Sequence, residues 1–173
     1  MPDDVVNALV PHGLTEPIRG SAEGSLVGTT FVLKDLFDIA GRKTGNGNPA
    51  VYERAAPKDA NAAVLTLLLE AGADCTGVAI CDEFFYSIAG DNHHYGIPGN
   101  THAPGCIPGG SSSGSVAATA AIALAFDLPY APGFVCGTSK PCSDFPSTSV
   151  FATNLFTPIP ETALRAVTVK SLK

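Results

Sequence analysis

The sequence has little charge, and this shortage limits what the chain can be. Only 15% of its 173 residues are charged, whereas 45% are hydrophobic. A typical self-contained soluble domain has about 25% charged residues. The composition therefore indicates that part of the apolar surface is covered by a partner. We expect this cover to come from a second copy of the chain, in a homo-oligomer, or from another protein.

Clusters of basic residues and long apolar runs are also missing. Ten Lys and Arg stand against 16 Asp and Glu, which gives a formal net charge of −6. Binding to nucleic acid needs clustered positive charge, so we expect no nucleic-acid partner. No run reaches the ~18 apolar residues of a membrane span, and the first residues, MPDD, are acidic where a secretory signal is basic. We therefore expect a cytoplasmic protein with no membrane contact.

The sequence lacks cysteine pairs with the spacing of a metal site. Its five cysteines are odd in number and include no CxxC motif, so we expect reduced thiols and neither a disulfide framework nor a zinc site. His93, His94 and His102 lie in one segment. Structural zinc sites usually use four ligands, however, and adjacent histidines rarely chelate together. We expect no metal and no cofactor.

Two segments give the clearest secondary-structure signals. Residues 29–39, TTFVLKDLFDI, are rich in β-branched and aromatic side chains, which predicts a strand with Lys34 in it or at its end. Residues 59–73, DANAAVLTLLLEAGA, carry apolar side chains at helical spacing. Asp59 is the expected cap of this helix and Gly72 the expected stop. A strand followed by a helix is the first half of an α/β unit.

Shorter elements extend this alternation. The sequence predicts a short helix over residues 4–10, a buried strand over 75–81 and a short helix over 82–89. The order of strands and helices predicts an α/β fold. Residues 90–110 show no periodicity, and long irregular segments inside a compact domain are usually functional or disordered.

The stretch PGGSSSGSVAA, residues 108–118, is either a flexible linker or a rigid functional loop. A Gly/Ser linker is flanked by polar, low-complexity sequence on both sides, whereas this stretch leads directly into an apolar helix expected over residues 112–126. Glycines allow a ligand to approach the backbone, and the N–H groups at a helix start favour negative charge. A functional loop, a structural turn and a phosphate-binding nest all fit this pattern.

Three motifs occur in the order and spacing of a known family: FVLKD (31–35), GVAICDEFFYSIAGDNHHYGIPGN (77–100) and PGGSSSGSVAATAA (108–121). Over about residues 26–125 the chain resembles the amidase signature hydrolases, and three co-linear motifs are more specific than one. The middle motif is especially similar to plant-type amidases acting on indole-3-acetamide. The resemblance implies a mixed sheet flanked by helices, incomplete at its C-terminal side, and hydrolysis of small-molecule amides.

The resemblance also implies roles for individual residues. The family uses a Ser, Ser, Lys triad, in which Lys34 corresponds to the base and Ser111 to the bridging serine, often held in a cis peptide, that relays the proton. Serine is a weak nucleophile that needs a base, and burial lowers the pKa of a lysine enough to make it one. By the same resemblance, four neighbouring residues are expected to bind the substrate: Gly109, Gly110, Ser112 and Ser113. The glycine-rich backbone would leave N–H groups free near the substrate oxygen.

The chain departs from the family after about residue 125. In the family, the nucleophilic serine follows the bridging serine by about two dozen residues, in a GTDTGGS-like loop. In this chain Val135 stands at that distance from Ser111. The look-alike GTSKPCS comes later and has Pro141 and Cys142 in place of both glycines; proline removes an N–H donor. We therefore interpret residues 1–125 as the N-terminal part of an amidase domain. Residues 126–173 are a divergent Pro/Ser/Thr-rich tail, as truncation, alternative splicing or a frame shift would produce.

Three functions fit the sequence. The chain is an amidase or the N-terminal portion of one, a catalytically inactive amidase-derived scaffold that binds a ligand or partner, or an unrelated α/β module with an anion site at residues 109–113. The family chemistry predicts that Lys34 and the loop of residues 111–113 meet in space. A structure in which no lysine lies near this loop would favour the third function.

Overall fold

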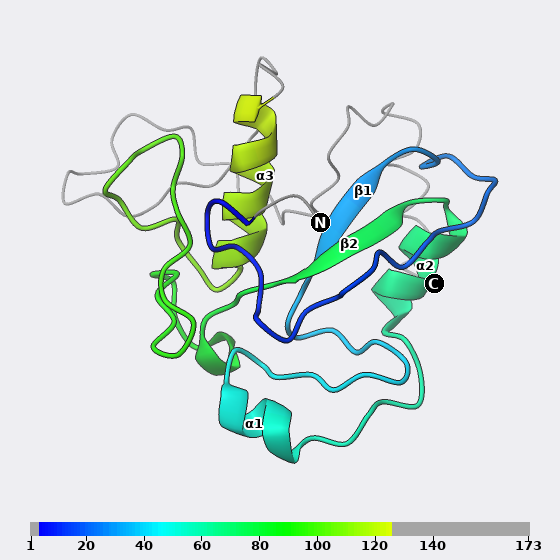
Figure 1. Ribbon diagram of the computed structural model, residues 1–173, viewed down its shortest axis with the longest axis horizontal. Helices are drawn as coiled ribbons and strands as arrows, with labels where there is room; N and C mark the ends of the chain where they lie inside the picture. The colour runs from blue at the N-terminus through cyan, green and yellow to red at the C-terminus, as the bar shows by residue number, and fades with distance from the viewer. Residues whose placement is uncertain (1–3, 126–173) are drawn as a thin grey trace.

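The computed structural model describes residues 4–125. Figure 1 shows a central pair of strands with α2 and α3 to either side, and α1 set apart from the strands. The expected alternation of strands and helices is therefore present. The elements in chain order are β1 (Thr30–Lys34), α1 (Pro49–Arg54), α2 (Ala63–Glu70), β2 (Asp74–Ala79), the 3₁₀ helix η1 (Glu83–Phe85) and α3 (Ser113–Ala125).

Strands β1 and β2 run parallel, and the chain between them supplies the long crossover connection that a parallel pair needs. Phe31 and Leu33 of β1 are buried, with 2% and 3% of their surface exposed, whereas Lys34 is half-buried. Lys34 ends β1 and pairs with Ala79, which ends β2. Lys34 and the residues that follow β2 therefore emerge at the same edge of the sheet.

The N-terminal segment adds antiparallel contacts to this sheet. Leu9 forms a β-bridge with Ala79, and the Val10 N–H donates a hydrogen bond of 2.9 Å to the Val78 carbonyl. The helix predicted over residues 4–10 is therefore wrong. An open strand edge offers unpaired N–H and C=O groups, and pairing with them outweighs the weak helical preference of so short a segment.

Helix α2 supplies the apolar face that closes the core. Leu65 and Leu68 are 0% and 6% exposed, and each buried leucine stabilises the fold by roughly 1.5–3 kcal/mol. The helix begins at Ala63, later than the predicted cap Asp59, and its N-cap makes no side-chain hydrogen bond. The expected stop is present, since Gly72 has φ of +97°, which favours glycine.

Two short elements differ from expectation. The helix predicted over residues 82–89 is reduced to η1, because Phe84 and Phe85 have φ of 49° and 60°, a left-handed conformation that breaks a helix. Helix α1 was not predicted, although its signal is in the sequence. The Asn48 side chain caps its start by accepting from backbone N–H groups, and a proline follows directly.

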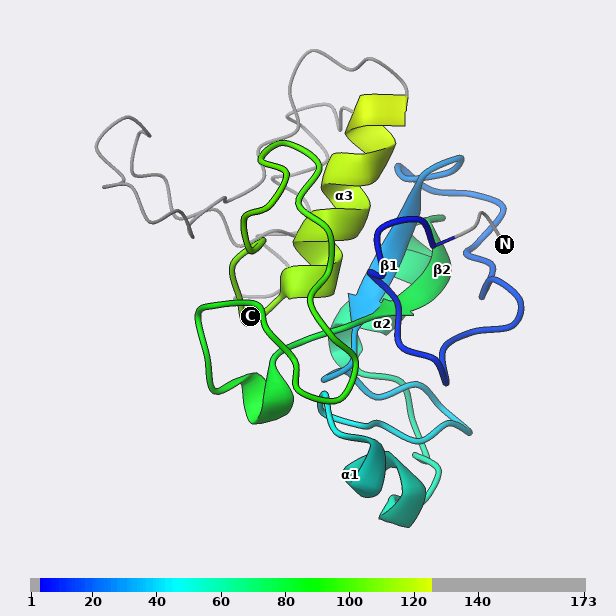
Figure 2. The same ribbon diagram turned by 60° about the vertical axis from the view of Figure 1, so that its left-hand side comes forward.

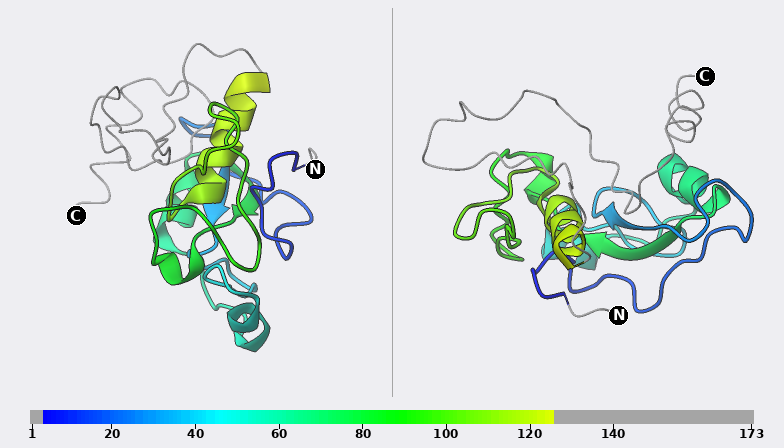
Figure 3. Two further views of the ribbon diagram at one scale, coloured as in Figure 1. Left: turned by 90° about the vertical axis from the view of Figure 1, so that its left-hand side faces the viewer. Right: turned by 90° about the horizontal axis from the view of Figure 1, so that it is seen from above.

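Helix α3 begins at Ser113, inside the Gly/Ser stretch and one residue after its predicted start at residue 112. Figures 2 and 3 show that the long irregular segment before it runs alongside α3. None of the helices described for residues 4–125 is long and apolar enough to cross a membrane. The tail predicted over residues 126–173 lies outside the described residues.

Candidate active site

Lys34 and Ser111 meet at the edge of the sheet where β1 ends. The Lys34 ammonium donates a hydrogen bond of 2.8 Å to the Ser111 hydroxyl. Lys34 comes from β1, and Ser111 comes from the loop before α3, a helix that packs against both strands. The predicted meeting of lysine and loop is therefore present. It removes the reason to prefer an unrelated anion-binding module.

The surroundings of Lys34 shift its protonation equilibrium toward the neutral form. Burial lowers the pKa of Lys34, and the negative charges of Cys81 and Asp82, when ionised, oppose this shift. Its ammonium also lies 5.4 Å from the centre of the Phe85 ring, which stabilises the charged form. Burial is the largest of the pKa effects, so Lys34 accepts a proton at lower pH than a surface lysine.

The loop before α3 is held from both sides by backbone hydrogen bonds. The peptide bond between Gly110 and Ser111 is cis. The Gly110 N–H donates to the Ile88 carbonyl at 2.9 Å, and the Gly114 N–H donates to the Ile80 carbonyl at 2.9 Å. The Gly110 N–H is therefore already paired. For Gly110, this corrects the expectation that the glycine N–H groups of the loop stay free near a substrate oxygen.

The predicted substrate-contacting residues differ in accessibility. Gly109 and Ser113 are buried, whereas Gly110 is exposed and Ser112 is partly exposed. Ser113 is 0% exposed, and within residues 4–125 its hydroxyl has no hydrogen-bond partner. In this arrangement only Gly110 and Ser112 of the four can touch a molecule that arrives from solvent. Their contact with substrate stays a prediction.

Sequence reasoning did not place Asp82 at the site, because it interpreted this residue as the start of a short helix. Asp82 is 0% exposed, and its N–H donates to the Ser111 carbonyl at 3.1 Å. Burial raises the pKa of its carboxyl, against hydrogen bonds from Gly90 and Ser87 that lower it. The signal that could have found it is its position, an acid directly after a buried strand that pairs with the strand of Lys34.

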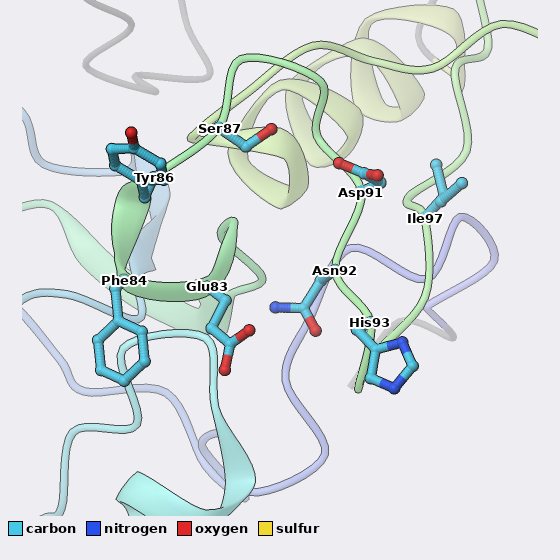
Figure 4. Close-up of a pocket in the computed structure, with 8 residues that line it drawn as sticks. All are labelled: Glu83, Phe84, Tyr86, Ser87, Asp91, Asn92, His93 and Ile97. Atoms are coloured by element: carbon cyan, nitrogen blue, oxygen red, sulfur yellow. The ribbon is translucent and has the colours of Figure 1, made fainter.

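A surface hollow lies close to the site in the chain. Figure 4 shows residues 83–87 on one side of it and residues 91–97 on the other. Neither Lys34 nor Ser111 is among the lining residues, which are Glu83, Phe84, Tyr86, Ser87, Asp91, Asn92, His93 and Ile97. Large side chains in and beside this hollow are exposed, Tyr86 to 93% and Ile88 to 84%. Exposed apolar surface of this kind agrees with the low content of charged residues in the chain.

The histidines of this segment lie at the surface, where His93, His94 and His102 are all exposed. The His94 Nε2 lies 3.3 Å from the Glu83 carboxylate. Among residues 4–125 no group of three or more His, Cys, Asp or Glu side chains is placed to hold a metal ion.

Two buried thiols, one in β2 and one just after it, are held in the protonated form. Cys75 and Cys81 are free cysteines with 0% exposure. Burial raises the pKa of Cys75 to about 11 and that of Cys81 to about 12. A nucleophilic cysteine needs a lowered pKa, so these two thiols act as small apolar side chains. Cys136 and Cys142 lie outside the described residues.

Comparison with curated proteins gives two informative relatives. The chain is 53% identical to "Amidase 1" of Oryza sativa subsp. japonica over 112 residues, which are 65% of this chain and 26% of that protein. It is 41% identical to "Outer envelope protein 64, chloroplastic" of Arabidopsis thaliana over 113 residues, 65% of this chain and 19% of that protein. The chain therefore spans about a quarter or less of the length of these relatives.

The second relative corrects the predicted location. A cytoplasmic protein was expected from acidic charge and the lack of a long apolar run. Relatives named for the outer envelopes of chloroplasts and mitochondria, at 41% identity, contradict that prediction. The error has a physical reason. Charge and hydropathy determine how a chain interacts with water, whereas a cellular address is read by receptors from particular segments.

Comparison with solved structures supports the fold. The chain superimposes with a TM-score of 0.54 and 40% identity on a chain from "An unexpected vestigial protein complex reveals the evolutionary origins of an s-triazine catabolic enzyme", covering 58% of this chain and 22% of that one. The predicted class, a mixed sheet flanked by helices, is confirmed by this neighbour and by the parallel pair with antiparallel bridges.

The family resemblance is also confirmed. The family model described as Amidase matches residues 13–128, more than half of the chain. This range contains both partners of the Lys34–Ser111 contact. The three sequence motifs, the fold and the lysine–serine pair thus agree with the family match, and the chain belongs to the amidase family.

Proposed function

We propose that this chain serves in the hydrolysis of carbon–nitrogen bonds of small amides, with Lys34 as the base and Ser111 as the proton relay. The observation that carries the proposal is the 2.8 Å hydrogen bond between the two side chains. Proton transfer needs heavy atoms within about 2.6–3.2 Å, so no rearrangement is needed at this step. The lowered pKa of Lys34, caused by burial, supports its role as a base.

The proposed reaction runs through an acyl-enzyme. A serine hydroxyl adds to the amide carbonyl while its proton passes through Ser111 to Lys34, and the carbon–nitrogen bond breaks as ammonia leaves with a returned proton. Water then hydrolyses the serine ester, so that amide and water give carboxylic acid and ammonia. The family pattern puts the attacking serine beyond residue 125, outside the described residues. We propose indole-3-acetamide as a probe because of the plant-type middle motif.

We expect the chain on its own to be a very poor catalyst. Val135 stands at the expected distance of the nucleophile, and Pro141 and Cys142 replace the glycines of the family loop. Loss of a single oxyanion donor typically removes about 10²–10³ in turnover. The paired N–H of Gly110 cannot replace such a donor, because it already binds the Ile88 carbonyl.

The same differences from the family's nucleophile loop are also compatible with a second function. An amidase-derived scaffold that binds an amide or a partner without turnover would keep the Lys34–Ser111 pair and lose the nucleophile loop. The exposed apolar side chains of the segment after β2 favour this alternative: Phe84, Tyr86, Ile88 and Ile97 are 51–93% exposed. A second copy or another protein that covers them would also account for the low charge.

The test follows ammonia released from indole-3-acetamide by the purified chain. Lys43→Ala is the matched control, since the Lys43 ammonium also lies over an aromatic ring, 5.7 Å from the centre of Tyr52, away from Ser111. We expect slow release that is lost in Lys34→Ala and Ser111→Ala and kept in Lys43→Ala. Turnover that persists without Lys34 would disprove its role. Binding of the amide without ammonia release would establish the scaffold alternative.

A further inference from the structure

A buried carboxylate lies beneath the loop that carries Ser111, and the proposed mechanism does not use it. Asp82 follows β2, so it emerges at the same sheet edge as Lys34. Its side chain is 0% exposed. A buried carboxylate costs free energy unless its contacts compensate. The contacts of Asp82 therefore show what it stabilises.

Asp82 is connected to the Ser111 loop through its backbone and its side chain. Its N–H donates to the Ser111 carbonyl at 3.1 Å. Its Oδ2 lies so close to Gly110 that a side chain at position 110 would collide with it. The loop can therefore lie this close to the Asp82 carboxylate only because residue 110 is a glycine.

The same carboxylate also holds the neighbouring segment. Its Oδ2 accepts a hydrogen bond of 3.2 Å from the Gly90 N–H. Gly90 in turn packs against the Gly109 carbonyl so closely that any side chain at position 90 would clash with it. The Gly110 N–H donates to the carbonyl of Ile88, two residues before Gly90. Asp82 thus contacts both the loop of residues 109–111 and the segment of residues 88–90 that packs against it.

We propose that Asp82 is a positioning residue whose carboxylate and N–H hold the loop of residues 109–111, so that the Ser111 hydroxyl stays within hydrogen-bond distance of Lys34. This inference rests on the proposed Lys34–Ser111 centre. Asp82 does not touch the reacting atoms and acts only through Ser111. The charged and titratable groups around it are Lys34, Cys81 and Asp91.

The test compares Asp82→Ala and Asp82→Asn with the matched variant Asp91→Asn, which removes a carboxylate from an exposed position of the same segment. Hydrogen exchange of the Gly110 amide reports the loop, and exchange of the Ala71 amide, bonded to the Leu67 carbonyl, reports the core. Acetylation of Lys34 relative to Lys43, read by mass spectrometry, reports whether Ser111 still covers the amine. The full chain is used throughout.

For Asp82→Ala we expect the Gly110 amide to exchange about tenfold faster or more, because the variant loses the hydrogen bond from the Gly90 N–H to the charged carboxylate. Exchange at Ala71 should stay unchanged. The Lys34 to Lys43 acetylation ratio should also change. Asp82→Asn keeps the shape and a weaker acceptor, so about threefold is expected, and Asp91→Asn should match the unmodified chain.

If Asp82→Ala does not fold, Asp82→Asn decides alone. Gly110 exchange that is unchanged in Asp82→Asn and in any folded Asp82→Ala overturns the proposal, as does an equal rise at Gly110 and Ala71, which would mean a general loss of stability. Ammonia release enters none of these measurements. An inactive chain would therefore contradict the proposed activity and leave the positioning role of Asp82 to be judged separately.

Discussion

Two regions meet at the Lys34–Ser111 pair, and they are held together by different forces. The sheet region, formed by β1, α2 and β2, buries an apolar cluster that includes Phe31, Leu65 and Ile80. The loop region, residues 83–110, leaves large apolar side chains exposed. It follows an irregular path after its 3₁₀ helix. Burial of apolar surface therefore explains the first region and cannot explain the second.

The loop region is fixed by polar side chains that bind the backbone. Asn92, 3% exposed, donates to the carbonyls of Gly47 and Cys81 at 2.7 and 2.8 Å. Its Oδ1 accepts from the N–H groups of His94 and Tyr95 at 2.8 and 2.9 Å. Side-chain amides replace strand and helix partners in such a segment. The Lys34–Ser111 contact therefore joins a region stabilised by apolar burial to a region stabilised by hydrogen bonds between polar side chains and the backbone.

The largest effect is expected in the sheet region. Leu65→Ala should lower the free energy of unfolding by about 2–5 kcal/mol, because it leaves a cavity at a side chain with 0% exposure. Urea unfolding followed by circular dichroism measures this change. Leu67→Ala on the same helix, where the side chain is only partly buried, should cost clearly less. Equal costs at the two positions would contradict the assignment of the buried face of α2.

A smaller and local effect is expected in the loop region. Asn92→Ala removes the donors of two backbone carbonyls and should cost about 2 kcal/mol, taking about 1 kcal/mol, the lower end of the range of 1–3 kcal/mol, for each buried group left unpaired. Hydrogen exchange should rise at His94 and Tyr95 before it rises in α2.

Asn100→Ala is the matched control for Asn92. The Asn100 side chain also accepts from two backbone N–H groups, those of His102 and Ala103, but it donates to one carbonyl, that of Ile107, in place of two, and it is more exposed than Asn92. It should have the smaller effect. If Asn92→Ala raised exchange evenly over both regions, the two would form one cooperative unit and the comparison would fail.

The smallest effect is expected for an ionic contact at the rim of the sheet region. Hydrogen bonds from the Gly20 N–H and the Arg19 side chain lower the pKa of Asp74. Its folded pKa is thus below the unfolded value of about 4, and its contribution is present above pH 4 and lost as the pH falls through the folded pKa. Arg19 is 75% exposed, which limits the contribution to about 1 kcal/mol or less.

The measurement is the pH dependence of unfolding of Asp74→Asn. We expect its stability to equal that of the unmodified chain at low pH and to be slightly lower near neutral pH. Glu70→Gln, an exposed acid just before β2, is the control and should change little. A larger loss at low pH than at pH 7 would contradict the direction of the shift.

The fold was predictable where apolar periodicity is strong. Strand β1, helix α2 and helix α3 lie within the predicted ranges, and strand β2 begins one residue before its predicted range. The prediction failed at residues 4–10, where Leu9 pairs with the edge of β2, and at residues 82–89, where two left-handed phenylalanines end the helix. In both places the local preference was weak, and contacts with distant residues decided the conformation.

The sequence by itself determined the family, because three motifs in fixed order identify the lysine and the serine loop. Only the tertiary structure decided that the Gly110 N–H is already paired, that Ser113 is buried, and that Asp82 lies beneath Ser111. Motifs record which residue types follow one another along the chain. Hydrogen-bond partners and burial arise from residues far apart in sequence, once β1 and β2 pair and α3 packs against them.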